Sequence, residues 1–129
     1  MKAVGLTRYL PIDDPAALQD LSIAPPGAPQ GRDLLVRIQA VSINPVDTKQ
    51  RAPRPQQENP ARILGYDAAG VVEAVGPEVT AFAPGDEVYY AGDVTRSGCN
   101  AQYQWVDERL VGRKPTTLDF AEAAALPLT

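Results

Sequence analysis

Hydrophobic residues recur at every second position in several short stretches, which is the spacing of a β-strand with one buried face. Leu34 and Val36 are the first apolar residues on one side of such a stretch, and Tyr103 and Trp105 lie together on one side of another. Other stretches are short runs of strand-forming residues between turn residues. The predicted strands cover residues 2–6, 18–23, 34–41, 71–75, 88–91, 101–105 and 109–113. Seven short strands separated by turns predict an antiparallel barrel or sandwich.

Helix signals are few and short. Asn44 is a favourable N-cap residue, and the proline after it suits a first helical position, so one or two helical turns are expected there. Near the other end, Thr116 and Asp119 have the spacing of a capping box before an alanine-rich stretch over residues 120–126. Pro127 is expected to end that second helix, because proline cannot continue the helical hydrogen-bond pattern.

Proline and glycine mark the connections between these elements. The stretch 52–62 is polar and rich in proline, and we interpret it as an exposed loop. The triplet 84–86 predicts a tight turn before the next strand. Gly70 and Gly76 flank a valine-rich strand, which indicates tight corners or a close approach of two backbones.

The ionisable residues exclude several kinds of chemistry. The chain has 16 acidic and 12 basic side chains, and a net charge of −4 argues against a nucleic-acid partner. Histidine is absent, so the commonest general base and metal ligand is missing and a Ser-His-Asp triad is excluded. Cys99 is the single cysteine, which rules out an internal disulfide and a cysteine-rich zinc site.

Targeting signals are not evident in the sequence. The apolar run at the start of the chain is too short for a signal peptide. No apolar run elsewhere approaches the ~20 residues that are needed to cross a bilayer. A lone thiol is compatible with a reducing compartment. We therefore expect a cytoplasmic protein that has no membrane partner.

Glycines and valines recur at fixed spacings in the middle of the chain. Residues 65–76 follow the pattern G-x-D-x-x-G-x-V-x-x-V-G, and residues 82–88 follow F-x-x-G-D-x-V. Both patterns resemble the N-terminal, GroES-like half of the medium-chain dehydrogenase/reductase superfamily, in its zinc-type alcohol dehydrogenase-like and quinone oxidoreductase branch. Residues 41–47, 100–103 and 119–128 also resemble segments of this family, so the likeness covers essentially the whole chain.

The resemblance implies a mainly β fold, a GroES-like antiparallel β-barrel with a few short helices. This catalytic domain would occupy residues 1–115, and residues 116–129 would form an exit helix and the start of a connection to a Rossmann domain. The G-x-G-x-x-G turn that holds a dinucleotide pyrophosphate is absent from the sequence. We therefore expect a fragment of a longer oxidoreductase that lacks the Rossmann domain and is inactive by itself.

The sequence departs from the zinc-dependent members of this family at two positions. Those members carry a cysteine near the start of the active-site turn, whereas this turn carries Asn44 and no cysteine. Tyr66 stands where they carry a histidine, and their four-cysteine loop is also missing. These departures indicate a member without zinc. The resemblance then implies hydride transfer from NADPH to a quinone or an α,β-unsaturated carbonyl, in which conjugation spreads the developing negative charge. It also implies a possible homodimer of the full-length protein.

The resemblance places the candidate site at a few residues. Asn44 and Tyr66 would donate hydrogen bonds near the nicotinamide and the substrate oxygen, and Asp47 would orient the turn. Asn44, Lys49 and Thr129 would contact the cofactor, although related reductases often carry a tyrosine at the position of Lys49. Each assignment has a structural alternative: Asn44 as a helix cap, Tyr66 as a core aromatic residue, and Asp47 as a turn residue.

A second function stays open at this point. A GroES-like domain alone can serve as a binding or interaction module without catalysis, with the stretch 52–62 as its contact. The alanine-rich exit helix and the turn at 44–47 favour the enzyme, because both make sense mainly beside a cofactor domain. Sequence past residue 129 would separate the two hypotheses.

Overall fold

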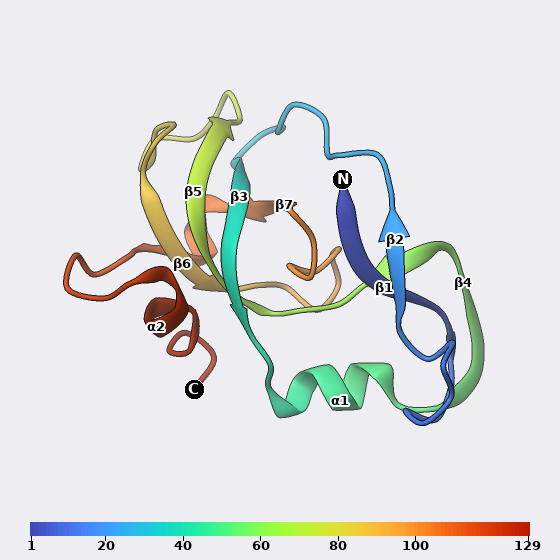
Figure 1. Ribbon diagram of the computed structural model, residues 1–129. Helices are drawn as coiled ribbons and strands as arrows, with labels where there is room; N and C mark the ends of the chain where they lie inside the picture. The colour runs from blue at the N-terminus through green and yellow to red at the C-terminus, as the bar shows by residue number, and fades with distance from the viewer.

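The computed structural model describes residues 1–129 as eight strands with three short helices (Figure 1). The elements in chain order are β1 (Lys2–Tyr9), β2 (Gln19–Ser22), β3 (Asp33–Ser42), α1 (Pro45–Arg51), β4 (Arg54–Ile63), β5 (Asp67–Val75), β6 (Glu87–Ala91), β7 (Tyr103–Asp107), a 3-10 helix (Glu108–Leu110), β8 (Val111–Arg113) and α2 (Phe120–Ala124). The predicted mainly β fold with few short helices is confirmed. Neither α-helix is long and apolar enough to cross a membrane.

The strands form two open antiparallel sheets. One sheet has the order β2-β1-β4, and the other has the order β7-β3-β5-β6-β8. An isolated bridge between Ala3 and Ala101 joins the first sheet to the segment before β7. In Figure 1 the two sheets lie side by side, with α1 crossing below them and α2 packed beside the larger sheet.

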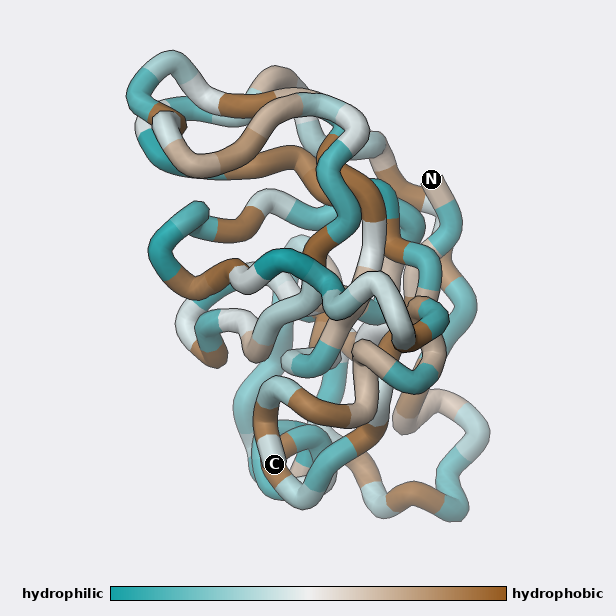
Figure 2. The backbone as a smooth tube through the Cα atoms, turned by 90° about the vertical axis from the view of Figure 1, so that its left-hand side faces the viewer, coloured by the Kyte–Doolittle hydropathy of each residue, from teal (hydrophilic) through white to brown (hydrophobic).

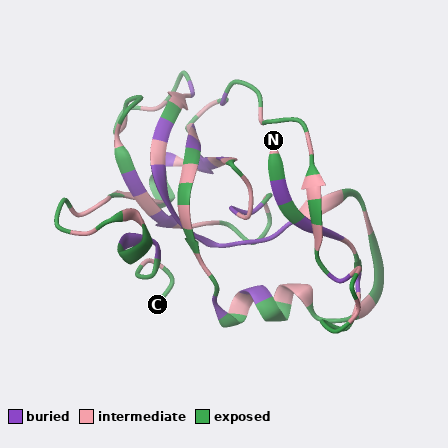
Figure 3. Ribbon diagram, in the orientation of Figure 1, coloured by how far each residue is buried: buried purple, intermediate pink, exposed green.

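Three groups of buried apolar side chains hold the fold together. The largest lies in the five-stranded sheet and consists of Leu34, Val36, Ala68, Val72, Val88, Tyr90, Cys99 and Val106. A second group lies between β1 and the segment that joins β4 to β5, and a third packs α2 against the larger sheet through Ala69, Ala123 and Ala124. Figure 3 shows the buried residues concentrated on β1 and on the central strand β5. Figure 2 shows the short alternating hydrophobic and hydrophilic stretches that this packing requires.

The stretch predicted as a loop at 52–62 is instead mostly β4, so that prediction was wrong. β4 pairs antiparallel with β1 and lies at the edge of its sheet. Proline removes a backbone donor, and an edge strand has one side on which no donor is needed. Pro55 and Pro60 are therefore compatible with this strand, although they disguise it in the sequence.

Two further details differ from the sequence expectation. The buried side of β7 carries Gln104 and Val106, whereas Tyr103 and Trp105 are only half-buried. The second helix begins with Asp119 as its N-cap, and Glu122 rather than Thr116 completes the capping box. Asp119 accepts a hydrogen bond from the Glu122 backbone at 2.7 Å, which satisfies a first-turn N–H.

Gly70 and Gly76 allow the close backbone contacts that the sequence indicated. A Cβ atom at Gly70 would lie 2.3 Å from the carbonyl oxygen of Arg37 on the neighbouring strand β3. A Cβ atom at Gly76 would lie equally close to the carbonyl oxygen of Gly31. The expected turn before β6 is also present, and Gly85 takes a φ of 95° there, a conformation that favours glycine.

Candidate active site

Asn44 lies between β3 and α1 and begins the helix, as the sequence predicted. Its backbone N–H donates to Asp47 Oδ2 at 2.8 Å, and the Asp47 N–H donates to the Asn44 carbonyl oxygen at 2.9 Å. Pro45 occupies the first turn, where no backbone donor is required. Both Asn44 and Asp47 are buried. These bonds fix the backbone of the turn that carries both side chains.

The side chain of Asn44 is bound to Asp67, a residue to which sequence reasoning gave no role in the site. Asn44 Nδ2 donates to Asp67 Oδ2 at 2.7 Å. Asp67 is fully buried at the first position of β5, and burial raises the pKa of its carboxyl group although the bond from Asn44 opposes the shift. The Gly-x-Asp pattern of the family resemblance was the only signal that could have pointed to it.

Asp47 is the second buried carboxylate of this region. Its Oδ2 accepts from Asn44, whereas its Oδ1 is buried without any hydrogen-bond partner. Burying an oxygen atom without a hydrogen bond typically costs about 1–3 kcal/mol of folding free energy, so Asp47 Oδ1 is not explained by stability. Its charge raises the pKa values of Tyr66, Asp67 and Cys99, after the larger effect of burial on each.

Tyr66 packs as a core aromatic residue. It is 1% exposed and contacts Leu6, Tyr9 and Leu64, with Val46 of α1 at the edge of the group. Its hydroxyl oxygen accepts a long hydrogen bond of 3.5 Å from Arg62 Nη2. Burial raises the pKa of Tyr66, and the nearby Arg62 guanidinium opposes that effect.

Arg62 is the cation nearest to Tyr66, and it lies in the stretch that the sequence presented as a loop. Its guanidinium also donates to Tyr9 Oη at 3.0 Å and to Gln50 Oε1 at 2.7 Å. Arg62 forms no salt bridge with a carboxylate, unlike Arg32 or Arg96. Its positive charge is therefore shared among neutral oxygen acceptors beside the Tyr66 hydroxyl.

The structure does not bring Lys49 and Thr129 into this cluster. Both residues are exposed, and neither forms a hydrogen bond with Asn44, Asp47 or Tyr66. The Thr129 hydroxyl instead donates to the Ala125 carbonyl oxygen at 3.2 Å. The preceding residue is closer, because the Leu128 backbone N–H donates to Asp67 Oδ1 at 2.9 Å.

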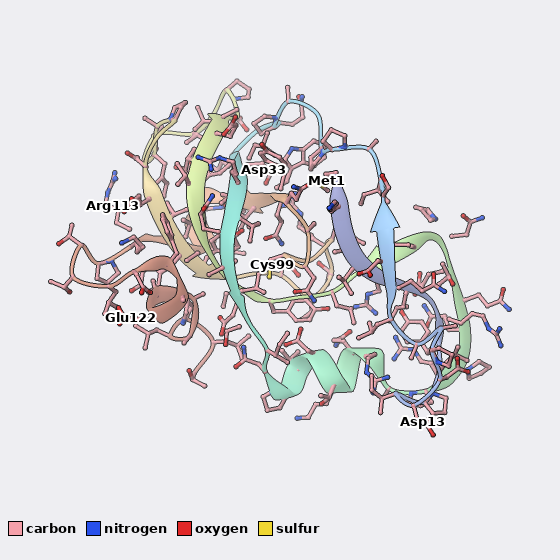
Figure 4. All side chains as sticks on the ribbon, viewed as in Figure 1. Met1, Asp13, Asp33, Cys99, Arg113 and Glu122 are labelled. Atoms are coloured by element: carbon pink, nitrogen blue, oxygen red, sulfur yellow. The ribbon has the colours of Figure 1, made fainter.

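Cys99 contacts the backbone of Asp67, next to the cluster of Asn44, Asp47 and Asp67. Figure 4 places its sulfur near the middle of the molecule, between the two sheets. The thiol donates to the Asp67 carbonyl oxygen at 3.3 Å, and burial raises the pKa of Cys99 to about 12. A thiol in this state is a poor metal ligand. No group of three or more cysteine or carboxylate side chains is arranged to hold a metal ion.

The largest cavity lies beside the cluster and not within it. It has a volume of about 960 Å³ and opens between β1, β2 and β3, with mostly apolar walls. Ile43 and Cys99 line it, whereas Asn44, Asp47 and Tyr66 do not. The buried polar side chains that hydrogen-bond to one another lie around Asn44, and we place the candidate active site there.

Comparison with known proteins agrees with this fold. Residues 30–116 match the alcohol dehydrogenase GroES-like domain. The chain belongs to this family. It is 43% identical over its whole length to a zinc-type alcohol dehydrogenase-like protein of Staphylococcus epidermidis, and it covers 38% of that protein.

Two solved structures show how far the likeness extends. A Rhizobium etli protein of the zinc-dependent alcohol dehydrogenase type is 58% identical to the chain, with a TM-score of 0.93 over 99% of the chain and 37% of that protein. The Escherichia coli quinone oxidoreductase complexed with NADPH is 26% identical, with a TM-score of 0.82 over 98% of the chain and 37% of that protein. The chain thus spans less than two fifths of these relatives.

Proposed function

We propose that this chain forms the substrate-side domain of an NAD(P)H-dependent oxidoreductase that reduces a quinone or an α,β-unsaturated carbonyl without zinc. The observation that carries the proposal is the bond between Asn44 and Asp67 at the position where zinc-type relatives are expected to hold a metal. A carboxylate engaged by an amide on Oδ2 and by a backbone N–H on Oδ1 is not free to coordinate. The protonated Cys99 thiol fits a metal no better.

A conjugated acceptor is the substrate class that this side-chain set can serve. NADPH, when bound, supplies a hydride to the substrate carbon. The negative charge that develops on the substrate oxygen is spread by conjugation, so hydrogen-bond donors can replace a Lewis acid. The Tyr66 hydroxyl accepts from Arg62 and donates to no protein group. In this proposal the buried hydroxyl directs its proton to that oxygen once the cofactor domain completes the cleft. The Arg62 charge lowers the pKa of Tyr66, although burial has the larger effect and the net pKa is raised.

The cofactor pyrophosphate needs a site that these residues do not contain, because no glycine-rich phosphate-binding turn is present. In this proposal the chain contributes the turn at Asn44 and the segment after α2, and a cofactor domain completes the cleft. A cytoplasmic location and a homodimer of the whole protein stay predictions. The predicted boundary between a catalytic domain at residues 1–115 and an exit helix at residues 116–129 also stays a prediction.

The test uses the full-length protein that carries this chain. We expect NADPH-dependent reduction of simple quinones and enones, without stoichiometric zinc after dialysis. Tyr66→Phe should lower kcat by about tenfold to a hundredfold, because one donor to a developing charge is lost. Tyr103→Phe is the matched control, since the Tyr103 hydroxyl forms no hydrogen bond and should leave kcat within about twofold.

Two outcomes would contradict the proposal. Stoichiometric zinc whose removal abolishes turnover would restore the metal mechanism of zinc-type relatives. Absence of NADPH binding and of turnover in the full-length protein would favour a GroES-like binding module without catalysis.

A further inference from the structure

One buried carboxylate joins three separate parts of the chain. Asp67 begins β5, Asn44 lies between β3 and α1, and Leu128 follows α2. The Asn44 amide donates to Asp67 Oδ2 at 2.7 Å, and the Leu128 backbone N–H donates to Asp67 Oδ1 at 2.9 Å. Both oxygens of this fully buried side chain are therefore used, one on each side.

We propose that Asp67 is a positioning residue that fixes the Asn44 carboxamide in the active site and fastens the segment after α2 beside it. The inference rests on the proposed function for its kinetic consequence, although the two hydrogen bonds themselves belong to the fold. Asp67 acts on the reaction only through Asn44 and the Leu128 segment. It is not itself a catalytic residue.

The orientation of the Asn44 carboxamide follows from its partners. Its nitrogen faces Asp67 Oδ2 and, at 3.4 Å, the carbonyl oxygen of Ser42. A carbonyl oxygen and a carboxylate are both acceptors, so the nitrogen and not the oxygen must point at them. The carboxamide oxygen points the other way, toward the Asp47 backbone N–H in the capping box, and its second lone pair can accept a hydrogen bond from a ligand. The ligand group that matches this oxygen is a hydroxyl or an amide N–H.

Only a carboxylate at this position can satisfy both partners. Asparagine has the same shape but a single acceptor oxygen, so Asp67→Asn must turn an NH2 group toward one of the two donors. A buried donor that faces another donor is left without its hydrogen bond. The backbone of Asn44 is held independently by Asp47, so the substitution should release the side chain without moving the turn.

The kinetic test is a double-mutant cycle in the full-length protein. Asp67→Asn should lower kcat/KM by about tenfold to a hundredfold, as expected for loss of a hydrogen bond to a charged group. In an Asn44→Ala background the same substitution should have a clearly smaller effect on kcat/KM, because the side chain that it positions is gone and only the contact with the Leu128 segment is left to lose. An undiminished effect in that background would overturn the proposal.

A matched control is available on the same strand. Glu73 of β5 is half-exposed and pairs with Arg37 at 3.5 Å. Glu73→Gln removes a carboxylate of β5 in the same way but far from Asn44 in the register of the sheet, and kcat/KM should stay within about twofold. An equal loss in this variant would show that any charge change on β5 disturbs the enzyme.

A second readout does not depend on activity. In the ¹⁵N-labelled 129-residue protein, the side-chain amides of asparagine arise only from Asn44, Asn59 and Asn100. We expect the Asn44 amide protons to exchange with water at least about tenfold more slowly than those of the exposed Asn59. Asp67→Asn should abolish that difference and increase exchange at the Leu128 backbone N–H.

The wild-type comparison needs no substitution, so it remains decisive even when Asp67→Asn fails to fold. Equal exchange at Asn44 and Asn59 would overturn the positioning role. Slow exchange at Asn44 together with an inactive full-length protein would instead support Asp67 as the anchor and refute the proposed function.

Discussion

Tyr90 and Gln104 are joined by a hydrogen bond inside the core of the five-stranded sheet. The Tyr90 hydroxyl donates to Gln104 Oε1 at 2.7 Å, and Gln104 Nε2 donates to the Ser97 carbonyl oxygen at 3.0 Å. Both side chains are buried, and burial raises the pKa of Tyr90 well above its ordinary value. This pairing explains how a glutamine can occupy the buried side of β7.

The pairing makes Tyr90→Phe a destabilising change. The phenylalanine ring fills the same space but leaves the buried Gln104 oxygen without a donor, which should cost about 1–3 kcal/mol in the free energy of unfolding. Urea denaturation of the wild type and the variant measures the difference. Tyr103→Phe is the control and should cost less than about 0.5 kcal/mol, because the Tyr103 hydroxyl has no partner. Equal effects would contradict the role of the bond.

Gly70 should tolerate no side chain. A Cβ atom there would lie 2.3 Å from the Arg37 carbonyl oxygen, which belongs to the backbone and cannot move without breaking the pairing of β3 with β5. Gly70→Ala should therefore lower the free energy of unfolding by more than about 2 kcal/mol. A Cβ atom at Gly27 would contact nothing within 4 Å, so Gly27→Ala is the matched control. Thermal melting of both variants tests the contrast.

Glu108 should anchor the connection between β5 and β6. Its Oε1 accepts from the backbone N–H groups of Thr80 and Ala81 at 3.2 and 3.0 Å, and Glu108 is 5% exposed. Glu108→Ala leaves both donors without this acceptor and should cost about 2–3 kcal/mol. The control is Glu73→Ala, which removes a half-exposed carboxylate whose partner Arg37 is also half-exposed, a pair worth less than about 1 kcal/mol. Chemical denaturation that ranks the two variants equally would refute the anchoring role.

The sequence predicted the strands whose patterning is local. Residues 34–41 alternate cleanly because Leu34 and Val36 face a core, and they lie in β3. β4 was missed because an edge strand tolerates Pro55 and Pro60, so its sequence looks like a loop. The strand β7 was predicted, but the wrong side of it was assigned to the core. Gln104 can be buried because Tyr90 of another strand donates a hydrogen bond to it, and the sequence around Gln104 does not show this.

The site shows the same division between local and distant causes. Asn44 and Asp47 were found because a helix start has a local signature that needs no tertiary information. Asp67 and Arg62 were not assigned to the site because their partners lie far away in sequence: Leu128 for Asp67, and Tyr9 for Arg62. Only a fold that brings these segments together makes such residues visible.

Cys99 should resist thiol reagents at pH 8 as long as the chain is folded. It is 1% exposed, and burial raises its pKa to about 12, so both access and the thiolate fraction are small. Ellman's reagent should react slowly with the native protein and rapidly in denaturant. Fast native labelling would show that the core around Cys99 is open.

The same pKa shift makes the stability of the fold dependent on pH in the alkaline range. The folded pKa of Cys99 lies above the ordinary value of 9.0, so folding favours the protonated thiol. This contribution is fully present below pH 9 and is lost as the pH rises through about 12. Cys99→Ala removes the titrating group, so the wild type should lose free energy of unfolding relative to this variant as the pH rises from 9 to 11. Urea denaturation across that range measures the difference, and a constant difference would show that Cys99 ionises as readily in the folded chain as in the unfolded one.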